Sequence, residues 1–344
     1  MDVVLLSRIQ FALTIGFHFI FPPLTIGLAW LIFWIMTKYK KTGDALYRNM
    51  ARFWIKIFTL SFAVGVATGI VMEFQFGTNW SEYSRFVGDI FGAPLAAEGI
   101  FAFFLESSFL ALLVLGWNRL SVKVHWFSSL MVAFGSTLSA LWIIIANSWQ
   151  QTPAGFEIVD GRAVLTDFWA AALNPSTIPR YLHTMDAALI SGAFFMMGLS
   201  AWFLLKGRHM EFAKRSLRIG LIVAFVTSLL ELGLGHYHAV QVANTQPEKL
   251  AAFEGLFETQ THAPMILFGI PDAEAETVHA AIRVPGFLSF LTDFNFNAEV
   301  QGLKDFPKDE WPPLGLTFFP FHLMFIIGMY FISVSYTHLT LPTN

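Results

Sequence analysis

The chain has 344 residues, of which 55% are hydrophobic and only 13% are charged, whereas an average soluble domain carries about 25% charged residues. Its formal net charge is −3 and it contains no cysteine. This composition argues for a membrane protein and against a nucleic-acid-binding one. It also excludes disulfides, thiolate-bound iron–sulfur clusters and c-type haem attachment, so that any redox metal must be held by His, Met or carboxylate ligands.

Seven hydrophobic runs are long enough to cross a bilayer, which requires about 20 mostly apolar residues. They lie at 11–37, 53–73, 94–117, 124–148, 183–205, 217–236 and 315–336. Each run is continuous rather than alternating, which favours helices over strands. The expected fold class is all-α: a polytopic transmembrane helix bundle, with about seven spans and a long extracytoplasmic loop.

The loops between the spans alternate in charge. Basic residues follow the first, third and fifth spans: Lys38, Lys40, Lys41, Arg48, Arg52, Lys56, Arg119, Lys123, Lys206, Arg208, Lys214, Arg215 and Arg218. Mainly acidic residues follow the second and fourth spans: Glu73, Glu82, Asp89, Glu157, Asp160 and Asp167. By the positive-inside rule, the N-terminus and the segment 237–314 are therefore expected outside the cell membrane.

Two histidines are expected inside the membrane near its outer side. His18 lies about two turns into the first span, and His183 opens the fifth. A lone intramembrane histidine more often hydrogen-bonds a neighbouring helix than binds a metal. Neutral imidazole is nevertheless the commonest axial ligand of haem. From these residues alone, both interpretations stay open.

The third span contains two carboxylates, Glu98 and Glu106. A carboxylate at the centre of a membrane helix costs about 3 kcal/mol, so both need partners, protonation or a water-filled path. In an α-helix their separation corresponds to about 12 Å of rise and about 80° of rotation past two full turns. Both are therefore expected to face one interior, as a proton relay requires, although a polar helix contact is the simpler interpretation. Hydroxyl residues that would extend a relay are Ser107, Ser108, Ser136, Thr137 and Ser139.

The segment 237–314 is long, polar and rich in Asp, Glu, Asn and Pro, and is expected to form a small extramembrane region. Met324 follows near the outer end of the last span. A methionine there is usually core filler, but His plus Met is a recognised low-spin haem ligation and His183 is expected at a similar depth. The predicted parts are a bundle at 1–236, an outer loop at 237–314, a seventh span at 315–336 and an anomalous tail at 337–344.

Four stretches are unusually polar for membrane spans and their loops: LSRIQFALTIGFHF, GVATGIVMEFQFGTNWSEYSRFVGDIFGAPLAAEGIFAFFLES, GSTLSALWIIIANSWQQTP and KLAAFEGLFETQ. They resemble subunit I of the cytochrome bd quinol oxidases, from about residue 5 to about residue 330. The resemblance implies a multi-pass enzyme of the bacterial inner membrane that oxidises ubiquinol or menaquinol and reduces dioxygen to water. It also implies two b-type haems and one d-type haem.

By this resemblance, His183 and Met324 ligate the iron of the low-spin b haem, while His18 and Glu98 match ligand positions of the high-spin pair. Which high-spin haem each of these two serves is left open. The resemblance further implies a second large membrane subunit, a small accessory subunit and contacts with membrane lipid.

The resemblance also places Glu106 on the proton route from the cytoplasm, and Lys249 and Glu254 in the quinol-oxidising outer loop. Quinol oxidised outside would release protons outside, while protons for water formation would enter past Glu106. This vectorial chemistry builds a proton gradient without a pump. The alternatives are a proton-coupled secondary transporter that uses Glu98 and Glu106, or a non-catalytic assembly subunit.

Three features depart from the family. The family continues through further spans, including a glutamate that ligates a high-spin haem, and these are expected to be missing here. His322 stands where the family often has an arginine, two residues before the ligating methionine. The terminal string SYTHLTLPTN does not resemble the family, so a truncated or misassembled reading frame is expected.

Overall fold

The computed structural model describes residues 2–340. Within that range, seven helical stretches are long and apolar enough to cross a membrane, and each begins before the corresponding predicted run. Their bounds are Val3–Thr42, Ala45–Gly77, Ser81–Leu115, Val122–Trp149, Thr177–Leu205, Met210–Thr245 and Leu314–Thr340. The prediction of an all-α bundle with seven spans is confirmed.

The chain forms two compact units. Of the described residues, 2–227 and 337–340 form the first, called unit 1, while unit 2 is Ser228–Tyr336. Both boundaries fall inside long helices, α9 (Met210–Thr245) and α12 (Leu314–Thr340). The predicted outer segment, 237–314, therefore begins inside a helix. The helix α9 continues through 237–245 because this stretch contains no proline or glycine, and the next helix begins at Pro247.

The first predicted span is two helices, α1 (Val3–His18) and α2 (Phe21–Thr42). The break precedes Pro22-Pro23, because proline cannot donate a backbone hydrogen bond and disfavours helical geometry in the residue before it. At its other end, α2 stops at Gly43, whose φ of 67° is left-handed. The next helix, α3 (Ala45–Gly77), begins with the Asp44 carboxylate accepting a hydrogen bond from the Leu46 amide at 2.8 Å.

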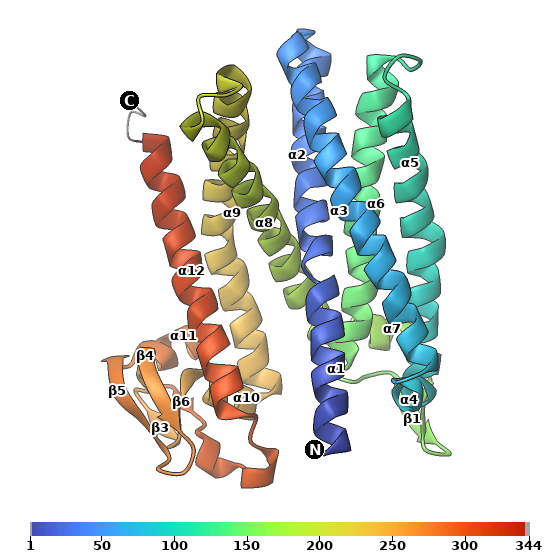
Figure 1. The fold of residues 1–344 in the computed structure, drawn as a ribbon. Helices are drawn as coiled ribbons and strands as arrows, with labels where there is room; N and C mark the ends of the chain where they lie inside the picture. Colours follow the sequence, from blue (N-terminus) through green and yellow to red (C-terminus); the bar gives the residue numbers. More distant parts are fainter. Residues whose placement is uncertain (1, 341–344) are drawn as a thin grey trace. The chain divides into compact units, whose positions relative to one another are not determined.

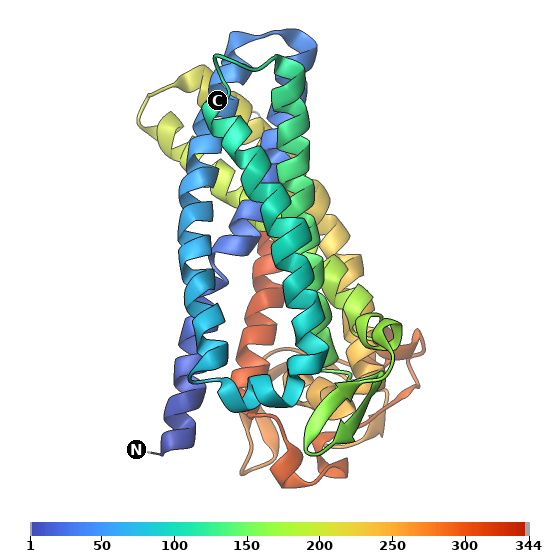
Figure 2. The ribbon, with the colours of Figure 1, turned by 90° about the vertical axis from the view of Figure 1, so that its right-hand side faces the viewer.

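The third span is also interrupted. It consists of α4 (Ser81–Ala97), a π-helical segment η1 (Glu98–Phe103) and α5 (Phe104–Leu115). The helix α6 (Val122–Trp149) then leads to the β1–β2 hairpin (Phe156–Val159 and Arg162–Leu165), the short α7 (Phe168–Ala172) and α8 (Thr177–Leu205). Figure 2 shows this hairpin beside α4, where the Leu165 amide donates to Asp89 at 2.7 Å.

The core of unit 1 lies where α2 packs on α3, α6 and α8, and where α5 packs on α6, as the ribbon shows (Figure 1). Large side chains fill its interior: Leu28, Ile35, Met50, Trp54 and Phe58. The indole of Trp54 donates to Ser216 at 3.2 Å. At the crossing of α2 and α8 the backbones nearly touch, since a Cβ at Gly27 would lie 2.2 Å from the Ala188 carbonyl oxygen. Small residues permit this close packing in membranes.

Unit 2 carries the outer segment. Its elements after α9 are α10 (Pro247–Glu254), β3 (Gln260–Thr261), β4 (Met265–Asp272), β5 (Thr277–Val284), α11 (Phe287–Asp293), β6 (Glu299–Val300), the 3-10 turns η2 (Leu303–Asp305) and η3 (Lys308–Glu310), and α12. The strands β4 and β5 form an antiparallel hairpin, and β3 pairs with β6. Polar as it is, the segment folds around its own apolar core, which includes Leu250, Phe253, Ile266 and Phe318. In Figure 1 these elements surround the N-terminal turns of α12.

Candidate functional site

His18 lies at the C-terminal end of α1, half-buried against α3. Its Nδ1 is 2.9 Å from the Thr68 hydroxyl oxygen. The single proton of that hydroxyl is already directed at the carbonyl oxygens of Val64 and Gly65, at 3.0 and 2.9 Å. Thr68 must therefore accept from His18, which places the ring proton on Nδ1. The other ring nitrogen, Nε2, has no hydrogen-bond partner among residues 2–340, and its lone pair remains available to a metal.

The π-helical segment begins at Glu98. Its diagnostic bond runs from the Phe104 amide to the Gly99 carbonyl, five residues earlier. Such a segment adds one residue to a helical turn. The separation of Glu98 and Glu106 then amounts to nearly two full turns, about 20° from perfect alignment rather than about 80°. The two carboxylates therefore face the same neighbouring helix, as the sequence predicts, but are more closely aligned than regular α-helical spacing would make them.

Both carboxylates meet serine hydroxyls on α6. Glu98 accepts from Ser139 at 2.6 Å, and Glu106, which is only 6% exposed, accepts from Ser136. The serines are one helical turn apart, so the pairs form two steps along one seam. Next to Ser136, Gly135 lets the helices approach, since a Cβ there would lie 3.1 Å from the Glu106 Cβ. Ser136 and Ser139, two hydroxyl residues of the predicted relay, thus lie beside the two glutamates. Nothing in the sequence marked Gly135 as the point where the helices approach.

His183 and Met324 belong to different units. His183 occupies the second turn of α8 in unit 1, where it is half-buried. Met324 lies in α12 of unit 2 and is 49% exposed. Their pairing across one haem stays a prediction.

Lys249 and Glu254 are both on α10, in the outer segment as predicted. They are about 140° apart around that helix. Lys249 donates to Gln246 at 3.3 Å. Glu254 ends the helix and is only 4% exposed, and burial raises the pKa of its carboxyl to about 8. Its Oε2 has no hydrogen-bond partner in the described part of the chain, so the neutral acid is the favoured form at pH 7.

His322, the residue that replaces the family's arginine, is 7% exposed. Its two ring nitrogens face backbone carbonyl oxygens of Phe318 and Ile266, at 2.9 and 2.8 Å. Both of these oxygens only accept, and a neutral imidazole has one N–H, so it donates to one of them at a time.

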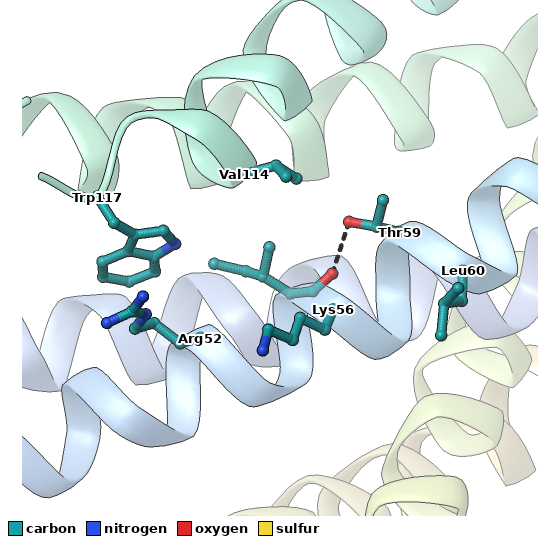
Figure 3. Close-up of a pocket in the computed structure, with 7 residues that line it drawn as sticks. Arg52, Lys56, Thr59, Leu60, Val114 and Trp117 are labelled. Atoms are coloured by element: carbon teal, nitrogen blue, oxygen red, sulfur yellow. Dashed lines mark hydrogen bonds between the residues drawn. The ribbon is translucent and has the colours of Figure 1, made fainter. Parts of the chain in front are cut away.

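A groove of about 350 Å³ lies elsewhere in unit 1, between α3 and the end of α5 (Figure 3). Arg52 and Lys56 line it, and the Arg52 guanidinium lies 5.5 Å from the centre of the Trp117 ring. Cations and tryptophan together are typical of the headgroup level of a membrane. None of the predicted site residues lines this groove.

Comparisons with known proteins cover nearly the whole chain. A family model described as "Cytochrome bd terminal oxidase subunit I" matches residues 6–342. The match therefore includes most of the string 335–344, which was expected to fall outside the family. Among solved structures, the bd oxidase from Geobacillus thermodenitrificans matches with a TM-score of 0.93 at 34% identity, over 98% of this chain and 78% of that one.

Two curated relatives show how much of a whole subunit the chain spans. The cytochrome bd-II ubiquinol oxidase subunit 1 of Escherichia coli (strain K12) is 46% identical over 316 residues, which are 91% of this chain and 62% of the relative. The cytochrome bd ubiquinol oxidase subunit 1 of Bacillus subtilis (strain 168) is 43% identical over 340 residues, which are 96% of this chain and 72% of the relative.

Proposed function

This chain belongs to the cytochrome bd terminal oxidase subunit I family, and from that premise we propose that it carries the haems of a quinol:oxygen oxidoreductase in the bacterial inner membrane. Ubiquinol or menaquinol is the electron donor, and dioxygen is reduced to water. A second large membrane subunit completes the oxidase, together with a small accessory subunit. The family gives no support to the alternative of a proton-coupled transporter.

The single observation that carries this proposal is the hydrogen bond from His18 to Thr68. An axial histidine must present an unprotonated nitrogen to iron, and a partner on its other nitrogen normally sets that tautomer. Thr68 does this for His18, which therefore fits a haem iron through Nε2. Bound haem supplies one-electron transfer and the reduction of dioxygen.

The remaining ligands follow from the family. Two b-type haems and one d-type haem are proposed, with His183 and Met324 on the low-spin b haem. Glu98 joins His18 in the high-spin pair. An intramembrane carboxylate is costly unless it is paired or bound to a cation, and the half-buried Glu98 has only Ser139 as a hydrogen-bond partner among residues 2–340. Iron is a suitable second partner.

Proton movements on the two sides are assigned to different carboxyls. Glu106 with Ser136 forms the inner step of a relay, and Glu98 with Ser139 the outer one. In the outer segment, Glu254 and Lys249 belong to the site where quinol is oxidised. A carboxyl whose pKa is about 8 exchanges its proton near neutral pH, and its ionised form is the base that accepts a proton from quinol. With the N-terminus outside, as the basic loops predict, quinol protons leave on the outer side.

The decisive experiment uses the oxidase assembled with its partner subunit. His183→Ala and Met324→Leu are each expected to remove the low-spin signal from reduced-minus-oxidised spectra and to leave high-spin absorption largely present. Met329→Leu, at another half-exposed methionine of α12, is the matched control and should change neither signal. A low-spin band that survives both ligand substitutions contradicts the assignment, and absence of any haem from the assembled protein contradicts the function.

A further inference from the structure

His322 forms a hydrogen bond between two separate elements of unit 2. Its Nε2 is 2.8 Å from the carbonyl oxygen of Ile266 on β4, and its Nδ1 is 2.9 Å from that of Phe318, one turn earlier in α12. A carbonyl inside an α-helix already accepts from the amide four residues on. The bond to Ile266 is therefore the one that joins the hairpin to the helix. Because a carbonyl only accepts, the imidazole is the donor.

The ring of His322 also lies inside an aromatic layer. Phe318 stacks on it with ring centres 3.8 Å apart, and Phe321 meets it edge-on at 5.5 Å. Phe321 in turn stacks on Phe253 of α10 at 4.2 Å. Phe318 presses against Gly255, where a Cβ would lie 2.9 Å from the ring. The helix α10 and the strand β4 are thus held against the same two turns of α12.

Two residues of the proposed function flank this layer. Glu254 lies between Phe253 and Gly255, both of which contact α12. Met324 follows His322 by two residues on the same helix. We propose that His322 is a positioning residue, which fastens the quinol-oxidising segment to the helix that carries Met324 and so keeps electron donor and acceptor sites at a constant separation. This inference rests on the proposed roles of Glu254 and Met324.

Two substitutions at His322 separate its hydrogen bond from its stacking. His322→Phe keeps an aromatic ring but leaves the Ile266 carbonyl without its donor, whereas His322→Gln retains a donor. In the assembled oxidase, hydrogen exchange at β4 is expected to rise about tenfold in His322→Phe, the equivalent of one hydrogen bond. His322→Gln should restore exchange to within about threefold of the wild type. Leu316→Ala, at an exposed residue of α12 outside the aromatic layer, is the control and should change nothing.

Function provides the second measurement. In His322→Phe the KM for quinol is expected to rise and the midpoint potential of the low-spin haem to shift, with haem content retained and both values recovered by His322→Gln. A purely structural role would lower the amount of assembled protein without moving either value. If His322→Phe does not assemble, Phe321→Leu tests the same layer, because it should raise exchange in α10 and leave β4 protected.

Three results would contradict the proposal or the proposed function on which it rests. Unchanged exchange at β4 in His322→Phe overturns the fastening. Raised exchange with an unchanged KM and potential overturns the link to electron transfer. A low-spin band that survives Met324→Leu removes the premise instead, whatever the exchange data show at β4.

Discussion

Replacing Glu254 by glutamine should remove a pH dependence from the stability of α10. Burial raises the pKa of this carboxyl from its ordinary value of 4.5 to about 8. The folded segment therefore binds the proton more tightly than an opened segment in water does. Its stability is highest below pH 4.5, falls as the pH rises, and levels off above about 8.

The slope follows from the linkage between protonation and folding. Between the two pKa values, the opening free energy falls by about 1.4 kcal/mol per pH unit. From pH 6 to pH 7.5 the loss is about 2 kcal/mol, or about thirtyfold in the opening equilibrium. Glutamine has a similar shape and no titration, so Glu254→Gln should show no such loss.

Hydrogen exchange of the α10 amides measures this difference. The intrinsic exchange rate also depends on pH, but it cancels when wild type and Glu254→Gln are compared at each pH. Glu248→Gln, at the other end of the same helix, is the control and should keep the wild-type slope. Parallel profiles for wild type and Glu254→Gln between pH 6 and pH 7.5 would refute the reasoning.

Three further predictions concern unit 1. Thr68→Val should shift the high-spin haem spectrum without loss of haem, because His18 stays in place but loses the hydrogen-bond partner of its Nδ1. Thr68→Ser should restore the wild-type spectrum. An unshifted spectrum in Thr68→Val would exclude the role of this hydrogen bond. Glu106→Gln should slow oxygen consumption while haem content is retained, and normal turnover would remove Glu106 from the proton route. Gly27→Leu should lower the stability of the assembled subunit by about 3 kcal/mol, the upper end of the usual cost of overpacking, because its side chain meets the α8 backbone. Gly16→Leu, with open space around it, is the control, and equal melting temperatures would contradict the packing.

Much of the site was visible in the residues before any fold was known. His18, Glu98 and Glu106 stand out because charged or titratable groups within apolar spans are rare and need partners. Glu254 is different, since nothing in a polar segment marks one carboxyl among many as buried. Glu254 was singled out only by the resemblance to the oxidase family. Its burial, between Phe253 and Gly255, became evident only in the folded outer segment.

The break between α1 and α2 had a local cause, Pro22-Pro23, yet the predicted span ran through it. Hydropathy is averaged over a window longer than the break, so a change of helix within an apolar run does not alter the sum. The π-helical segment at Glu98 is harder still. A π-helical turn contains one more residue than an α-helical turn, but no residue type marks it in the sequence. Its effect is to change the side of the helix on which Glu106 lies.

By itself, the sequence determined the number of spans, the all-α class and the residue types able to hold a redox metal, because each depends on composition within a single segment of chain. Only the tertiary structure decided that Thr68 orients His18, that Ser136 and Ser139 meet the two glutamates, and that His322 reaches Ile266, 56 residues away. These contacts join different elements, and their geometry depends on how the helices pack, which no local pattern specifies.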